Sequence, residues 1–196
     1  MKKTLLLITS LFVSQANAAM LSFDDILGGN IQNSFGDMPI YKGFAFSTTL
    51  KWIDVEETLS WDFGARSGEF ALTNRNGRIG TITEQSGEYF TFDGLWAKKW
   101  FTPKESGGDD SLSGTLEGYN NGTLVWGVGT SLNGSYERYG AQLGLIDELK
   151  LDLGNQFLVD DLSLTVSPIP EPSSIALMLG GLGLVGFMAA RRTKKG

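Results

Sequence analysis

The chain has 196 residues, which suits one domain of ordinary size, and its formal net charge is −6. It contains no cysteine and no histidine, which excludes disulfides, thiolate or imidazole metal sites, cysteine nucleophiles and Ser-His-Asp triads. Residues 19–167 contain ten basic and twenty-one acidic side chains, a net charge of −11, so no nucleic acid is expected as a partner.

The first eighteen residues have the pattern of a secretory signal peptide. Lys2 and Lys3 precede a short apolar run over 5–13, and this run is too short to span a membrane. Ala16, Asn17 and Ala18 form an A-x-A cleavage pattern. We therefore expect signal peptidase to cut before Ala19 and the chain to be exported through the inner membrane.

Residues 19–167 are predicted to form β-strands, because apolar and polar residues alternate between Gly, Asn and Ser punctuation. Asn-rich turns at 74–77 and 120–122 predict hairpins, and 104–113 is a polar loop. The expected fold is all-β, an antiparallel jelly-roll-like β-sandwich forming a single ectodomain. The expected strands are 21–24, 43–47, 50–55, 69–73, 78–83, 88–92, 95–102, 114–119, 123–132, 145–151 and 157–166.

Five tryptophans lie in this body, at Trp52, Trp61, Trp96, Trp100 and Trp126. An indole ring stacks on the apolar face of a sugar, so each is a candidate glycan contact. The alternative for each is a place in the core of the sandwich. Trp96 and Trp100 are expected on one face of a strand, with Lys98 between them.

Without histidine and cysteine, paired carboxylates are the remaining route to acid–base catalysis. The segment 52–57 is similar to the E-I-D-x-x-E strand of laminarinase-type glycosidases, in which the first Glu is the nucleophile and the last the general acid. Trp52 stands at the nucleophile position, so the covalent partner is missing. Glu56 and Glu57 are expected at a solvated strand end, and no catalytic residue is assigned.

The C-terminal segment 168–196 has three parts. Pro170, Glu171 and Pro172 lie in a stiff, extended stretch. Residues 174–190 carry no charge and include four glycines, which predicts a short transmembrane helix suited to close helix packing. The basic residues after it predict a cytoplasmic tail by the positive-inside rule, and they are Arg191, Arg192, Lys194 and Lys195.

These three parts, in this order, resemble the PEP-CTERM sorting signal of Gram-negative bacteria. The resemblance implies recognition and cleavage at or near Pro170–Pro172 by an exosortase, a membrane cysteine transpeptidase. It also implies a transient inner-membrane anchor, delivery to the cell surface or extracellular matrix, and an association with exopolysaccharide and biofilm.

The body is similar to ectodomains that precede this signal, through the short stretches 23–26, 67–68 with 71–74, 90–92, 118–119 and 157–162. The last stretch, FLVDDL, also resembles the final strand of jelly-roll carbohydrate-binding modules. That resemblance implies a structural calcium held by Asp160 or Asp161 together with Asp24 or Asp25, since calcium takes six to eight oxygen ligands. The alternative is that these aspartates face solvent or end a strand.

The expected function is that of an exported, non-catalytic surface or matrix protein that contacts exopolysaccharide. Two alternatives remain open at this point. One is a carbohydrate-active enzyme, a glycosidase or lyase, on a sandwich fold. The other is a self-assembling surface subunit. Glycan affinity, turnover or concentration-dependent polymers would separate the three.

Overall fold

The computed structural model describes residues 17–26, 35–55, 63–102, 112–167, 179–184 and 186. The chain divides into a compact unit from Gln15 to Pro168 and a second unit made of both terminal segments. In the second unit, residues 179–184 are helical. No helix in the described ranges has the length and apolar character needed to cross a membrane. Most of the expected span 174–190 lies outside the described residues.

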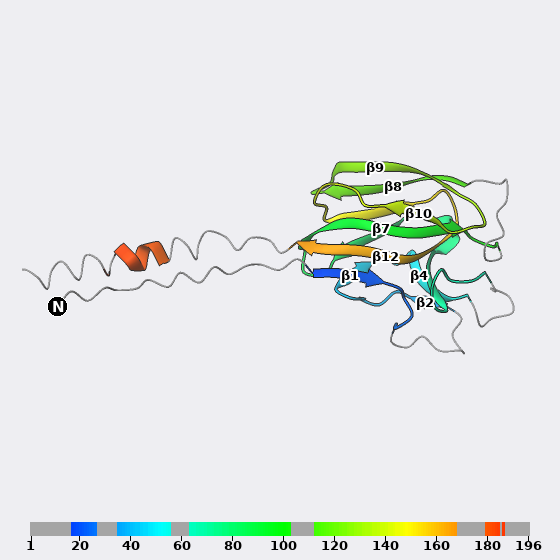
Figure 1. The fold of residues 1–196 in the computed structure, drawn as a ribbon, viewed down its shortest axis with the longest axis horizontal. Helices are drawn as coiled ribbons and strands as arrows, with labels where there is room; N and C mark the ends of the chain where they lie inside the picture. Colours follow the sequence, from blue (N-terminus) through cyan, green and yellow to red (C-terminus); the bar gives the residue numbers. More distant parts are fainter. Residues whose placement is uncertain are drawn as a thin grey trace, which may run out of the picture. The chain divides into compact units, whose positions relative to one another are not determined.

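The compact unit is an antiparallel β-sandwich (Figure 1). One sheet has the order β10-β7-β12-β5-β4-β2, with β1 also paired to β12, and the other has the order β3-β6-β11-β8-β9. This arrangement confirms the all-β, two-sheet prediction. The strands are β1 (Asn17–Leu21), β2 (Phe35–Asp37), β3 (Phe44–Phe46), β4 (Leu50–Asp54), β5 (Phe70–Asn74), β6 (Gly80–Glu84), β7 (Tyr89–Lys99), β8 (Leu112–Asn120), β9 (Thr123–Leu132), β10 (Glu137–Gly140), β11 (Glu148–Asp152) and β12 (Phe157–Ser167).

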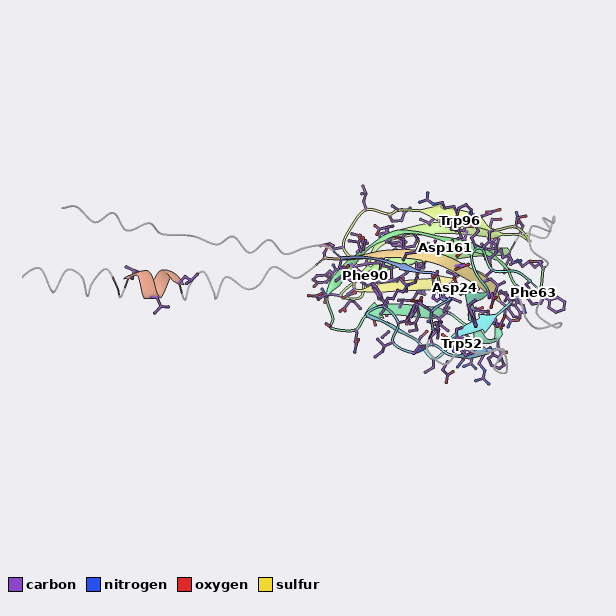
Figure 2. All side chains as sticks on the ribbon, turned by 60° about the horizontal axis from the view of Figure 1, so that its bottom comes forward. Asp24, Trp52, Phe63, Phe90, Trp96 and Asp161 are labelled. Atoms are coloured by element: carbon purple, nitrogen blue, oxygen red, sulfur yellow. The ribbon has the colours of Figure 1, made fainter. Side chains whose placement is uncertain are left out.

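Two apolar clusters stabilise the sandwich. The large cluster lies between the sheets and includes Phe44, Phe90 and Phe157, all without exposed surface. A smaller cluster on the outer face of the larger sheet includes Ile53, Phe63 and other buried side chains. Phe90 and Phe63 mark opposite ends of the sandwich in Figure 2. Because both of its faces are covered, β4 is buried at all five positions.

Several strand predictions differ from the structure at their ends. The expected strands 88–92 and 95–102 form one continuous strand, β7, which the bulge at Gly94 does not interrupt. The expected strand 21–24 is wrong beyond residue 21, because Phe23 has a φ of 66° and turns the chain away. The short strands β2 and β10 were not expected. Three or four residues offer too little alternation to be recognised.

The two predicted hairpin turns have different outcomes. Residues 120–122 do connect the paired strands β8 and β9, with φ of 48° at Asn121 and 73° at Gly122. The prediction of a hairpin at 74–77 is wrong, since this turn leads from β5 in one sheet to β6 in the other. Asn76 in this turn has a φ of 54°, so the residue types correctly predicted a left-handed backbone conformation. They did not show which two strands the turn connects.

The last strand, β12, contains an irregularity at its centre. Its core residues before this point are Phe157 and Val159, and after it Leu162 and Leu164. The register against β7 shifts between Asp160 and Ser163, and Asp161 has a φ of 47°. This bulge changes which alternate positions face the core, because one extra residue reverses the two-residue period of a strand.

Candidate functional site

The bulge in β12 lies at the point on one edge of this strand where the neighbouring strand changes from β5 to β1. β7 pairs with β12 over nearly its whole length. On the other edge, Leu158 and Val159 pair with β5, whereas residues 162–166 pair with β1 (Figure 1). The break between β5 and β1 therefore falls at Asp160 and Asp161. We call this place the strand junction.

Carboxylates bind the backbone of residues 67–70 at the strand junction. The Ser67 N–H donates to Asp160 at 2.9 Å, and the Ser67 hydroxyl donates to Asp161 at 2.8 Å. The N–H groups of Glu69 and Phe70 donate to one oxygen of Asp24, at 3.0 and 3.2 Å. Asp24 and Asp161 are labelled in Figure 2. These bonds attach the segment that leads into β5 to the ends of β1 and to β12.

Asp160 has no exposed surface, and burial raises its pKa to about 7. The N–H donors of Ser67 and Asp161 oppose this rise, while the nearby charges of Asp161 and Asp24 add to it. The backbone at Gly68 lies close to the Asp24 carboxylate, because a Cβ added to Gly68 would lie 2.0 Å from an Asp24 oxygen. Glycine is favoured at this position, because another residue would displace the Asp24 side chain and would be strained at its φ of 59°.

The four expected calcium ligands do not all gather at the junction. Asp25 turns instead to Tyr41, whose hydroxyl donates to it, and to Lys42 at 3.5 Å. The Tyr41 hydrogen bond lowers the pKa of Asp25. Both oxygens of Asp160 accept N–H groups, from Ser67 and Asp161.

The carboxylate oxygens of Asp24, Asp160 and Asp161 at the junction therefore accept hydrogen bonds from backbone N–H groups and from the Ser67 hydroxyl. No group of three or more acidic side chains able to hold a metal is found in the described part of the chain. Calcium binding here stays a prediction.

Of the five tryptophans, Trp52 belongs to the core and Trp126 is partly buried against it. Trp52 is 6% exposed and packs on Gly36 and against Phe70, with ring centroids 5.8 Å apart. Trp126 packs on Gly118 and against Phe92 at 5.4 Å, and its indole nitrogen is buried without a hydrogen-bond partner in the described structure. Little of the Trp52 indole is left for a ligand, whereas Trp126 keeps part of its surface exposed. Contact of either ring with a glycan stays a prediction.

Trp96 and Trp100 lie together on the outer face of the larger sheet, as expected from their spacing, and both pack against the smaller cluster. Arg66 covers Trp96 at 4.5 Å, and Phe63 packs against Trp100 at 4.9 Å. Between them Lys98 is fully buried, donating to the carbonyls of Phe63 and Thr102. Trp61 lies outside the described residues.

A hollow of about 250 Å³ opens on this face beside Trp100. Phe35 and Ile53 line it as paired positions of β2 and β4, together with the polar side chain of Gln156. A second hollow of about 460 Å³ shares Lys51, Arg75 and Asn76 with the first and extends to Asp37 and Arg78. We call the two together the basic groove. The sequence did not indicate it as a site, because residues 74–77 predict only a turn and 78–83 only a strand.

The cationic turn of the groove is held by one buried side chain. Asn74 is 2% exposed and donates to the carbonyls of Arg78 and Asn155, at 2.7 and 2.9 Å. The Phe157 N–H donates back to Asn74 at 3.2 Å. A Cβ at Gly77, whose φ is 67°, would lie 2.3 Å from an Asn155 oxygen. The turn is therefore fixed against the start of β12 before any ligand arrives.

Lys51 lies at the base of the groove and is 8% exposed. Burial and then the charge of Arg75 lower its pKa. Its ion-pair partner is Asp37, whose side chain is 81% exposed. Arg75 and Arg78 are exposed, and neither forms an ion pair with any described residue. The groove therefore has more positive than negative charge in a body whose net charge is −11.

The glycosidase-like segment has no open acid pair in the described residues. Trp52 is in the core and Asp54 is 1% exposed. Glu56 and Glu57 lie outside the described residues.

The sorting residues Pro170, Glu171 and Pro172 also lie outside the described residues, as do Ala16 and the basic tail at 191–195. Ala18 and Ala19 belong to β1, where they pair with Thr165 and Leu164. Signal-peptide cleavage before Ala19 stays a prediction.

Comparison with protein families finds one match, the PEP-CTERM protein-sorting motif, at residues 168–192. A search of curated proteins finds no match. Among solved structures, the sandwich is similar to a tandem of two family 22 carbohydrate-binding modules from Paenibacillus barcinonensis Xyn10C, with 13% identity, a TM-score of 0.44, and coverage of 83% of this chain and 49% of that one.

A variant of a family 29 carbohydrate-binding module gives 10% identity, a TM-score of 0.41, and coverage of 81% and 99%. The C-terminal family 22 module of Clostridium thermocellum Xyn10B gives 13% identity, a TM-score of 0.39, and coverage of 78% and 95%.

Proposed function

We propose that this chain, which carries a PEP-CTERM sorting motif at residues 168–192, is an exported surface or matrix protein whose β-sandwich binds glycan without catalysis. The sorting motif is the observation that carries the proposal. It implies processing by an exosortase and a membrane-associated C-terminal region. The N-terminal signal pattern agrees with export.

The sorting step is tested by replacing Pro170, Glu171 and Pro172 with alanine in the producing bacterium. We expect an uncleaved chain that stays in the inner membrane, detected by fractionation and by its mobility on a denaturing gel. Ser173→Ala is the matched control, since it changes a neighbouring residue outside the triplet. Normal processing of the triple variant would exclude the exosortase step.

Glycan binding is supported by the basic groove, in which Trp100 lies beside polar and charged side chains. Aromatic rings with nearby hydrogen-bonding groups are suited to sugars. Affinity electrophoresis of the full chain in detergent, with the exopolysaccharide of the producing bacterium in the gel, tests this. We expect retardation, and a repeat with calcium and with chelator tests the calcium prediction at the same time.

The enzyme alternative is less well supported, because the glycosidase-like segment 52–57 lacks the nucleophile of the motif that it resembles. Trp52 occupies the place of the nucleophile and is buried. Incubation of the same polysaccharide with the chain, followed by measurement of new reducing ends and of unsaturated products, separates the two classes. Turnover that requires the chain would overturn the non-catalytic assignment.

Self-assembly is a second candidate, favoured by β9. Within the described sheet β9 pairs only with β8, and its ten residues include no charge and no proline. Natural proteins usually protect such an edge with charge, so an uncharged edge is suited to pairing with another strand. Sedimentation over a concentration series should show oligomers that Val125→Lys abolishes. Leu143→Lys, at a side chain 94% exposed but outside β9, is the control.

A further inference from the structure

We propose that the basic groove binds a carboxylated glycan, with Arg75 and Arg78 holding the sugar carboxylates and Trp100 forming the wall against which a sugar ring packs. This inference rests on the proposed glycan-binding function and specifies the chemical class of its ligand. Three features of the groove support it: its positive charge, the ordered turn that carries the two arginines, and the apolar and amide side chains of its wall.

The charge distribution is the first argument. Residues 19–167 contain ten basic side chains, and three of them line this groove. One carboxylate, that of Asp37, lines the groove with them, and it is bonded to Lys51 and largely exposed. Two guanidinium groups are thereby left to attract an anion. On a body of net charge −11, an anionic polymer would be repelled over most of the surface and attracted here.

The chemistry of the cations is the second argument. A guanidinium group presents paired N–H donors that match the two oxygens of a carboxylate. Arg75 and Arg78 stand on a turn fixed by Asn74 and by the close contact of Gly77 with Asn155. Because this backbone is already ordered, binding does not require the turn to be immobilised first.

The wall of the groove is the third argument, and it favours a sugar over a peptide or a simple ion. Phe35, which is 54% exposed, and Ile53 form an apolar surface beside Trp100. Asn76 and Gln156 add amides able to bond to hydroxyls. The first hollow, which these side chains line, is about 250 Å³, and the second, continuous with it through Lys51, Arg75 and Asn76, is about 460 Å³, within the ~300–1,000 Å³ typical of sites for small ligands.

The test compares two polymers of the same backbone. The full chain, in detergent and attached to a sensor, is exposed to oligogalacturonate and to the same oligomer with its carboxyl groups reduced to alcohols. We expect binding of the acidic oligomer that weakens as salt is raised, and binding of the reduced oligomer at least tenfold weaker.

Two variants assign this binding to the groove. Arg75→Gln combined with Arg78→Gln should weaken binding of the acidic oligomer by about tenfold or more, since charge-assisted hydrogen bonds are lost. Arg138→Gln removes one exposed guanidinium that does not line the groove, and it should leave binding unchanged. Trp100→Phe keeps a ring against Phe63 and should weaken binding without unfolding the sandwich.

Each other outcome has a definite meaning. Equal binding of both oligomers, unaffected by the arginine changes, overturns the carboxylate inference and leaves glycan binding in place. Absence of binding to either oligomer and to the native polysaccharide overturns the proposed function as well. If polyglutamate binds equally well, and the variant with both arginines replaced loses this binding, the groove is an unselective anion site. That outcome overturns recognition of the sugar.

Discussion

The carboxylate of Asp160 accepts the N–H of Ser67 at 2.9 Å, although 93 positions separate the two residues in the chain. This bond joins the last strand to the segment that enters β5. It lies at the point where β5 and β1 succeed one another along β12. Of the three aspartates that hold the junction, Asp160 is the fully buried one.

Asp160 should make the stability of the sandwich depend on pH. Burial raises its pKa from 3.8 to about 7. Between these two pKa values the folded protein binds a proton that the unfolded chain does not. The free energy of unfolding should therefore fall as pH rises from about 4 to about 7, by about 4 kcal/mol at most. Urea denaturation followed by tryptophan fluorescence at pH 5 and pH 8 measures this. Asp160→Asn should be less stable at pH 5 and should lack this decrease, and an unchanged decrease in the variant would assign it to other groups.

Gly68→Ala should destabilise the sandwich, because the added Cβ would lie 2.0 Å from the Asp24 carboxylate and the φ is 59°. Gly87→Ala is the matched control, with a φ of 78° and open space around the added atom. The control variant should lose about 1 kcal/mol of unfolding free energy, because backbone strain alone destabilises it. Gly68→Ala should cost about 2 kcal/mol more in denaturant unfolding. Equal losses of unfolding free energy in the two variants would show that the Asp24 side chain moves aside freely.

Lys98→Met should also lower the free energy of unfolding. The Lys98 ammonium is buried and donates to the carbonyls of Phe63 and Thr102, and both carbonyls would lose a donor. The expected loss is about 1–3 kcal/mol. Lys99→Met, at the neighbouring partly exposed position, should change stability by less than about 0.5 kcal/mol. A neutral result for Lys98→Met would mean that packing of the methionine compensates for the lost bonds.

Local patterns predicted the sandwich well where a strand has one buried and one exposed face. β9 has the bounds that alternation and the flanking turn predicted, Thr123–Leu132. Alternation could not show which strands pair, so the turn at 74–77 was assigned to a hairpin. The bulge at Asp160 was readable in principle, since core positions change from odd at Val159 to even at Leu162.

The residues that form the candidate sites were harder to predict from the sequence than the strands were. The FLVDDL ending indicated Asp160 and Asp161, but the strand pattern at 69–73 did not show that the N–H groups of Ser67 and Phe70 bond to aspartates distant in sequence. The basic groove combines Lys51 from β4, the turn at Arg75 and a tryptophan after β7. No local spacing relates these residues, because the sheet order brings them together. The burial of Trp52 and the partial burial of Trp126 likewise depend on packing against Gly36 and Gly118.

The position of β12 has a mechanical consequence for a chain retained by its C-terminal end. β12 has neighbours on both edges, with β7 on one and β5 followed by β1 on the other. Tension applied at Ser167 would act along this strand, parallel to its axis. Antiparallel ladders loaded in this direction are sheared, so their hydrogen bonds must fail together and cannot open one by one. A ligand held by the turn at Arg75–Arg78, which Asn74 bonds to the start of β12, would pull on the opposite end of the same strand.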